Sequence, residues 1–381
     1  MRRRTLLLLV PLTLVALAHN GPANIPVFST PAAVHVDADS GFARLIATLS
    51  EPGGFFDSDN LISNEASYLH VLGILRRTGV QGGAYIGVGP DQNFSYIAEI
   101  RPEAAFIIDI RRDNLLHHLL LKALFANARN RMDYLCLLFG KPAPHDLDRW
   151  NESSIEEIVE YLDVMPSDAD VFEDAVSRLR ETIESFGVPL DERDYGTIRR
   201  FHSAFHAAGL DLRFTSRGRA ARRYYPTYRA LLFETDRDGR KGNYLVDEER
   251  FGFIKQMQRE NRIIPVVGDL AGNHALAAIG EEIERRNLVV SAFYTSNVEY
   301  YLMLDGTFDR FASTVTESLP HGGNGVMIRS YFSRGVPHPH NMNGYYATQL
   351  VEPLTRFVEE HRNGGYASYA DLVSKHILPF R

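Results

Sequence analysis

GAYIGVGPDQNFSYIAEIRPEAAFIIDIRRDN, residues 83–114, is the stretch of sequence that decides the fold. Its apolar run 84–88 ends in glycines and a proline, which stop a strand and turn the chain. Residues 92–100 then place apolar side chains at helical spacing. Arg101-Pro102 ends that helix, because the residue before a proline is disfavoured in the α conformation. A second buried strand is predicted over 104–110, so the stretch predicts a βαβ unit.

The turn between the first strand and its helix has the character of a nucleotide-binding turn. Gly87 and Gly89 occupy the first two glycine positions, where the backbone can approach a ligand closely. Gln92 stands where a dinucleotide fingerprint has its third glycine. Asp109 lies near the end of the second strand, at the roughly 20-residue spacing from which a carboxylate holds ribose hydroxyls.

The alternation of helix and strand resumes after residue 225. Predicted helices precede predicted strands three times, as 248–259 before 263–267, 275–286 before 288–293, and 308–316 before 325–332. Strands separated by helices predict an α/β fold with a doubly wound, mostly parallel sheet, Rossmann-like in class. Residues 131–223 carry helical patterns without a strand of similar quality, so a helical insertion is predicted at about residues 130–225.

The remaining segments are predicted to surround that sheet. Residues 19–53 read as an extended lead-in followed by a short helix, and the Rossmann-like domain is predicted over 54–381. The tail is predicted to be helical over 350–360 and 370–378.

The composition is that of a globular protein with a large core. Of the 381 residues, 45% are apolar and 23% are charged, which allows one large domain or two ordinary ones. The net charge of −7 gives no reason to expect nucleic-acid binding. The single cysteine, Cys136, excludes an internal disulfide and lies in an apolar run that favours a buried thiol.

The N-terminus resembles a secretory signal peptide. Arg2, Arg3 and Arg4 precede the short apolar run 6–18, which ends in an A-x-A cleavage pattern. Residues 1–18 are therefore predicted to direct export to the periplasm or medium, with no stable membrane span after cleavage. The alternatives are an anchor formed by residues 5–18 and a cytoplasmic protein with a wrongly assigned start codon.

Polar residues stand at the carboxyl end of each predicted strand, where sheets of this kind bind ligands. Asp91 and Asn93 follow the first strand, Asp109 ends the second, and Asp269 follows the third. The fourth is followed by the polar and aromatic segment 294–301. An unpaired charge away from water is costly, so these side chains need partners. A small polar ligand would supply them.

A further polar cluster, residues 57–65, precedes the glycine turn. Asp57, Asn60 and Asn64 are its candidate ligand-binding side chains, whereas Ser63 is placed to cap a helix predicted over 65–77. Two interpretations of residues 57–65 stay open: they form a loop that faces the ligand, or they form only helix caps and turns.

The strand-end pattern resembles the class I S-adenosylmethionine-dependent methyltransferase fold. In that family a glycine turn cradles the methionine part of the cofactor, an acid after the second strand binds the ribose, and an acid after the third lies near the adenine. The resemblance implies these cofactor-binding residues here: Gly87, Gly89, Asp91, Asn93, Asp109 and Asp269. Two positions depart from the family, because Tyr85 replaces an acid and Asp91 replaces the last glycine of the turn.

Longer stretches are similar to an uncharacterised, often exported bacterial family with the same core. They span most of residues 54–329 and are FFDSDNLISNEASYLHVL (55–72), GVGPDQNFSYIAEIRP (87–102), IIPVVGDLAG (263–272) and SAFYTSNVEYYL (291–302). This second resemblance implies no activity.

Two functions are compatible with these patterns. The first is a methyltransferase that uses S-adenosylmethionine and works mainly by positioning its substrate. In it, Tyr294, Asn297 and Tyr300 would orient the substrate and Glu299 would act as a base. The second is an exported protein that uses the same pocket for another small polar ligand or a partner, without methyl transfer. S-adenosylmethionine is a cytosolic metabolite, so export favours the second.

Other chemistries lack their motifs. His338, His340 and His321 have no H-E-x-x-H spacing, and His202 with His206 has helical i, i+4 spacing but no third ligand in the pattern. We therefore expect no metal site. A G-x-S-x-G nucleophile elbow and a P-loop are also absent from the sequence.

Export can be tested by fractionating bacterial cells that produce the chain with a C-terminal tag. We expect a shortened protein in the exported fraction, with His19 as its first residue, because the charged and apolar regions match a signal peptide. Replacing Arg2, Arg3 and Arg4 with glutamate should retain it in the cytosol. Full-length protein found only in the cytosol would contradict the prediction.

Overall fold

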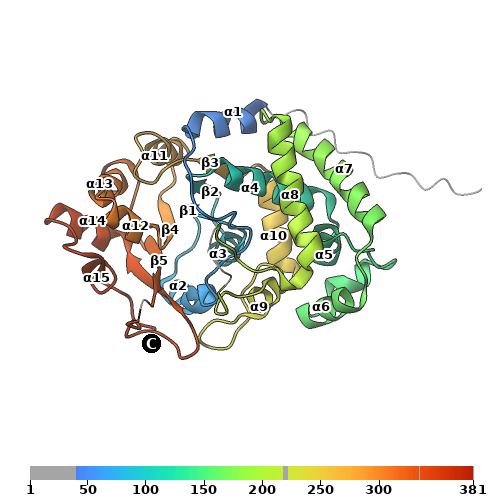
Figure 1. Cartoon of the computed structure of the whole chain (residues 1–381). Coiled ribbons are helices and arrows are strands. Elements are labelled where there is room, and N and C mark those ends of the chain that lie inside the picture. The colour runs from blue at the N-terminus through green and yellow to red at the C-terminus, as the bar shows by residue number, and fades with distance from the viewer. Residues whose placement is uncertain (1–39, 218–221, 334, 381) are drawn as a thin grey trace, which may run out of the picture. The chain divides into compact units, whose positions relative to one another are not determined.

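Figure 1 shows the computed structural model, which describes residues 40–217, 222–333 and 335–380. The strands are β1 (Ala84–Gly87), β2 (Ala104–Asp109), β3 (Ile263–Val267), β4 (Val290–Ser296), β5 (Val326–Phe332) and β6 (Ala347–Pro353). The α-helices, with η marking 3-10 turns, are α1 (Ser40–Leu49), η1 (Tyr68–Val71), α2 (Leu72–Thr78), α3 (Gln92–Ile100), α4 (Arg112–Asn127), α5 (Arg131–Phe139), η2 (Asp148–Asn151), α6 (Ile155–Val164), α7 (Ala169–Ser185), α8 (Glu192–Ala208), η3 (Gly209–Asp211), α9 (Tyr228–Phe233), α10 (Glu248–Arg259), α11 (Ala275–Arg285), α12 (Val298–Leu304), α13 (Phe308–Ser318), α14 (Leu354–Arg362) and α15 (Tyr369–Leu372). The predicted signal peptide and most of the lead-in lie outside the described residues.

The described strands form one sheet in the order β3-β2-β1-β4-β5-β6. Neighbours from β3 to β5 run parallel, and β6 pairs antiparallel with β5. This is the strand order of the doubly wound dinucleotide-binding fold, here with the last strand reversed. The predicted α/β fold with a mostly parallel, Rossmann-like sheet is confirmed. The order reverses between β1 and β4, which places a crevice at their carboxyl ends.

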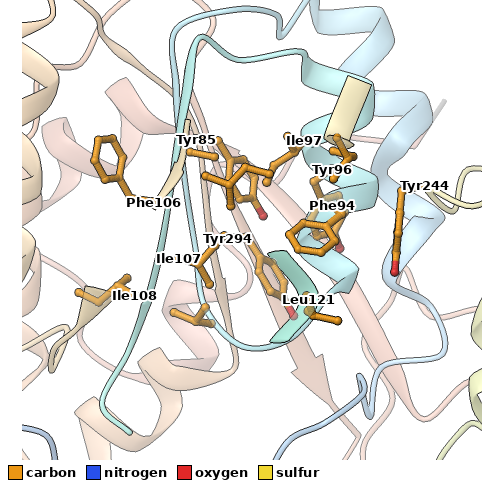
Figure 2. Close-up of a cluster of buried hydrophobic side chains, with 14 of the residues drawn as sticks. Tyr85, Phe94, Tyr96, Ile97, Phe106, Ile107, Ile108, Leu121, Tyr244 and Tyr294 are labelled. Carbon is orange, nitrogen blue, oxygen red and sulfur yellow. The ribbon is translucent and has the colours of Figure 1, made fainter. Parts of the chain in front are cut away.

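The sheet is buried on both faces, so β1, β2 and β3 are almost continuously apolar. Figure 2 shows Phe106 and Ile108 on one side of β2 and Ile107 on the other. On the second side, the ring of Tyr96 from α3 lies 5.2 Å from that of Tyr294 on β4. The apolar side chains that predicted a strand and a helix separately therefore pack against each other across the βαβ unit.

The helices lie in two layers. On one face α10 contacts both α3 and α4, and on the other α13 contacts both α11 and α14. The helices α5 to α9 are inserted between β2 and β3, and α4 packs against both α7 and α8. The loop of residues 55–65 lines a cavity together with residues at the carboxyl ends of β1, β2 and β4.

The predicted helix over 350–360 was wrong in its first part. Residues 347–353 form β6, which pairs with β5 from Phe332↔Ala347 to Val326↔Pro353, and α14 begins only at Leu354. A short apolar run such as Leu350-Val351 does not distinguish strand from helix, so pairing with β5 decides. The predicted helix over 370–378 is limited to α15.

A buried ion cluster joins the last two strands to α12. Arg329 of β5 donates to Glu299 of α12 through Nε at 2.8 Å and Nη2 at 3.1 Å. Its Nη1 donates to Glu352 of β6 at 2.6 Å, and the Tyr366 hydroxyl donates to Glu352 at 2.6 Å. All three charged side chains are almost fully buried, so each depends on its partners for compensation.

Replacing Arg329 with methionine should lower the free energy of unfolding by about 3–5 kcal/mol, because two carboxylates would lose their buried cation. Burial already raises the pKa of Glu352, with Arg329 opposing that shift. Without the arginine, protonation relieves the defect, so the deficit should be larger at about pH 8 than at about pH 5. Chemical denaturation at both pH values measures it.

The matched control is Arg356→Met, which breaks an exposed pair with Glu359. Exposed pairs contribute little, so this change should cost less than about 1 kcal/mol. Equal losses for the two variants would show that the buried cluster does not stabilise the fold.

Candidate functional site

A cavity of about 370 Å³ lies at the carboxyl ends of the parallel strands. Residues after four different strands line it, namely Gly89, Asp109, Asp269 and Asn297. The loop of residues 55–65 forms the facing wall, including the predicted residues Asp57, Asn60 and Asn64. The cavity sits where the strand order reverses, as expected for a doubly wound sheet.

Asp109 forms a clamp with Arg111 two residues later. Its Oδ1 accepts from the Arg111 amide at 2.9 Å and from Nε at 3.0 Å, and its Oδ2 accepts from Nη2 at 2.8 Å. Arg111 Nη1 also donates to the carbonyls of Ser58 at 2.7 Å and Asp59 at 2.9 Å. The guanidinium therefore fixes the loop 55–65 over the end of β2 and partly occupies the carboxylate that was predicted to bind ribose.

Gly87 is required by packing inside the turn. A Cβ on this residue would lie 2.0 Å from Oδ1 of Asn93 and 2.7 Å from the Tyr85 ring. Asn93 is fully buried, accepts from the Tyr85 hydroxyl at 2.7 Å and donates to the carbonyls of Val88 and Pro90. Gly87 and Asn93 thus shape the turn from behind and do not line the cavity.

Gly89 is the glycine of the turn that faces the cavity. Its φ of +85° is favourable for glycine and strained for other residues. A Cβ here would approach the Asn60 side chain to 3.1 Å. His118 of α4 donates through Nε2 to the Gly89 carbonyl at 2.9 Å, which holds the turn from the opposite side.

Asp91 points away from the cavity, contrary to its predicted role as a cofactor ligand. Its Oδ2 accepts from the hydroxyls of Tyr244 at 3.1 Å and Tyr228 at 3.3 Å, both fully buried. Burial raises the pKa of Asp91 to about 6, and the two phenols lower it in part. Asp91 therefore joins the glycine turn to α9 of the insertion and to the segment that follows it.

The ends of β3 and β4 form two more walls of the cavity. Asp269 accepts from the Ala271 amide at 2.9 Å, and its own amide donates to Glu51 at 2.8 Å. Ser296 ends β4 with a φ of +53°, which turns the chain so that Asn297 faces the cavity. Both Asp269 and Asn297 are therefore available at the strand ends.

Glu299 and Tyr300 do not reach the cavity, so their predicted catalytic roles are not supported by their positions. Glu299 is turned to the back of α12 and bound to Arg329, and Thr295 donates to it at 3.1 Å. Tyr300 packs edge-to-face on Tyr369 at 5.1 Å. Tyr294 is also absent from the lining, because its ring is buried within the sheet packing.

Glu65 lines the cavity and was missed as a site residue. Its Oε2 accepts three hydrogen bonds, from the Tyr294 hydroxyl at 2.7 Å, from Gln349 Nε2 at 2.8 Å and from the Ser330 hydroxyl. Its Oε1 accepts one, from the Ser296 hydroxyl. Burial raises the pKa of Glu65, and these four neutral donors oppose the shift. Gln92 extends the network by donating through Nε2 to the Tyr294 hydroxyl at 2.6 Å.

Aromatic side chains surround the mouth of the cavity. Phe55 is 74% exposed, and Phe56 packs edge-to-face on Tyr301 of α12 at 5.9 Å. Phe214 and Tyr225, both from the insertion between α8 and α9, complete this lining. A planar or apolar part of a ligand could contact these rings.

The histidines serve the packing of the fold. His202 and His206 contact the carbonyls of Leu137 and Phe139, each at 2.9 Å. His338 contacts the Val373 carbonyl at 3.0 Å. Over residues 40–217, 222–333 and 335–380, no group of three or more His, Cys, Asp or Glu is placed to hold a metal ion.

Fold and site define an α/β protein with a Rossmann-like sheet and a polar cavity at its strand ends. The family model described as Domain of unknown function (DUF7790) matches residues 61–376, and the chain belongs to this family. No curated protein matches the chain. In the part of the chain that the structure describes, no helix has the length and apolar character of a membrane span.

Replacing Arg111 with alanine should release the loop 55–65, because the side chain joins the carbonyls of Ser58 and Asp59 to Asp109. We expect faster amide exchange across residues 55–60, measured by hydrogen–deuterium exchange. The free energy of unfolding should fall by about 3 kcal/mol, because Asp109, whose side chain is only 11% exposed, loses its cation.

The neighbouring Arg112→Ala variant is the control, since Arg112 points to Asp194 and the Pro189 carbonyl outside the cavity. Unchanged exchange over 55–60 in the Arg111 variant, or equal effects in both variants, would contradict a clamp.

Proposed function

We propose that the protein binds S-adenosylmethionine across the ends of β1, β2 and β3 and transfers its methyl group to a substrate held near β4. The observation that carries this proposal is the single cavity that Gly89, Asp109, Asp269 and Asn297 share at the reversal of strand order. A polar hollow at this position suits a nucleoside with a charged substituent.

The residues present fit the cofactor at three points. Gly89 lets the backbone approach the methionine part, since it carries no Cβ on the cavity side. Asp109 keeps acceptor capacity beyond its bonds to Arg111, because a carboxylate offers about four lone-pair sites. Ile110 and Leu270 line the cavity beside Asp269 and provide apolar surface for a base.

Positioning is the main chemical contribution of such a site. Methyl transfer requires the acceptor atom in line with the methyl group, and holding both reactants supplies much of the rate. Asn297 would orient the acceptor from the end of β4, and Tyr301 with Phe56 would bury its apolar part. The bound cofactor supplies an activated methyl group when present.

The clamp on Asp109 favours a second candidate, an exported protein that binds another small polar ligand without methyl transfer. Both oxygens of Asp109 already accept from Arg111, which reduces its capacity to hold two ribose hydroxyls. In this alternative the same cavity takes a ligand available outside the cytosol.

Calorimetry with S-adenosylmethionine and S-adenosylhomocysteine tests the proposal. We expect both to bind the wild type, and Asp269→Asn to weaken both by about tenfold, since a bond to a charged acceptor contributes about 1.5–3 kcal/mol. Asp309→Asn is the control, because that side chain is 91% exposed and outside the cavity. No heat with either ligand would exclude methyl transfer and leave the second candidate.

A further inference from the structure

Glu65 carries a buried carboxylate without a cationic partner in the described part of the chain. It is 1% exposed, and its hydrogen bonds come from two serines, a tyrosine and a glutamine. Asp109, whose side chain is 11% exposed, is neutralised by Arg111, and Glu299 is neutralised by Arg329. Buried Asp91 also relies on neutral phenols, but it does not line the cavity. A buried charge that neutral dipoles alone stabilise remains costly and attracts a cation.

The two oxygens of Glu65 are not equally occupied. Oε2 accepts three hydrogen bonds, from Tyr294, Ser330 and Gln349. Oε1 accepts one, from Ser296, which itself lines the cavity. Since a carboxylate oxygen has two lone pairs, Oε1 retains acceptor capacity at the cavity wall.

The cavity as a whole is negatively charged. Among the described residues that line it, five are carboxylates and one is a cation: Asp57, Glu65, Asp109, Asp269, Asp305 and Arg111. That cation is bound to Asp109 and to two carbonyls of the facing loop. A hollow lined by one sign of charge concentrates ligands of the opposite sign.

We propose that Glu65 forms a subsite for a cationic group of the ligand, an ammonium or sulfonium, which contacts Oε1 from the cavity. The subsite lies beside Ser296 and Gln92, and Gln92 offers a buried Oε1 that lacks a partner among the described residues. This inference rests on the proposed function for the nucleoside part of the ligand, but the preference for positive charge comes from the cavity itself.

Three nucleoside probes separate charge recognition from nucleoside recognition. S-adenosylmethionine carries a sulfonium and an ammonium, S-adenosylhomocysteine an ammonium, and 5′-methylthioadenosine neither. We expect Glu65→Gln to weaken the two amino-acid-bearing probes by about tenfold or more and to leave 5′-methylthioadenosine within about twofold. Equal weakening of all three probes, or of none, would overturn the subsite. Glu282→Gln serves as the control, because Glu282 is a buried carboxylate of α11 outside the cavity.

The wild type provides a test that needs no variant at Glu65. The titratable groups around this carboxylate are Tyr294, Tyr85 and Tyr96, and burial holds the pKa of each above its usual value. The other charged residues that line the same cavity are Asp57, Asp109, Asp269, Asp305 and Arg111. Because burial raises the pKa of Glu65, acidification should weaken S-adenosylmethionine more than 5′-methylthioadenosine. Parallel pH profiles would contradict the subsite.

A final arm separates this inference from the proposed function. If no nucleoside binds the wild type, methyl transfer is excluded, and methylammonium and tetramethylammonium then probe the subsite directly. Compared with potassium at equal ionic strength, they should raise the melting temperature of the wild type and not of Glu65→Gln. Equal shifts in the two proteins, or no shift in either, would exclude a cation subsite at Glu65.

Discussion

Burial of both faces of the sheet is the constraint on which the rest of the structure depends. With helices on either side, polar side chains can lie only at strand ends or in compensated pockets. The chain compensates its buried carboxylates in three ways. Asp109 pairs with one arginine, Glu299 and Glu352 share another, and Asp91 and Glu65 rely on neutral donors. Glu65 faces the cavity, where a ligand can complete the compensation.

The three arrangements have different consequences for the site. The hydrogen bonds of Arg111 to Asp109 and to the Ser58 carbonyl join the loop 55–65 to β2, and this loop forms one wall of the cavity. The cluster around Arg329 lies behind β4 and fixes α12, which keeps Asn297 and Tyr301 on the cavity side. The network around Glu65 joins β4, β5 and β6 through their side chains. Carboxylates paired with arginines and a buried carboxylate that lines the cavity therefore lie close together at the strand ends.

The sequence predicted the parts of the fold that depend on local patterns. The βαβ unit is contiguous, and its glycines, helix spacing and Asp109 are all within about 30 residues of one another, a length typical of such units. The meeting of the strand ends at one cavity was also predictable, because parallel strands have their carboxyl ends on the same side of the sheet. Glu65 was missed because its partners Ser330 and Gln349 are 265 and 284 residues away. The pairing of Glu299 with Arg329 was not predicted, because the turn at Ser296, which sets the orientation of α12, leaves no local pattern.

The charge of the cavity determines what kind of ligand each of the two candidate functions requires. Arg111 weakens the case for a ribose at Asp109, whereas Glu65 favours a positive group near Ser296. A nucleoside with a sulfonium places its positive group at Glu65, but its ribose forms only some of its hydrogen bonds with Asp109. A smaller cationic ligand contacts Glu65 and needs no contact with Asp109. Binding at both the Asp109 end and the Glu65 end of the cavity would therefore favour methyl transfer, whereas binding at the Glu65 end alone would favour the second candidate.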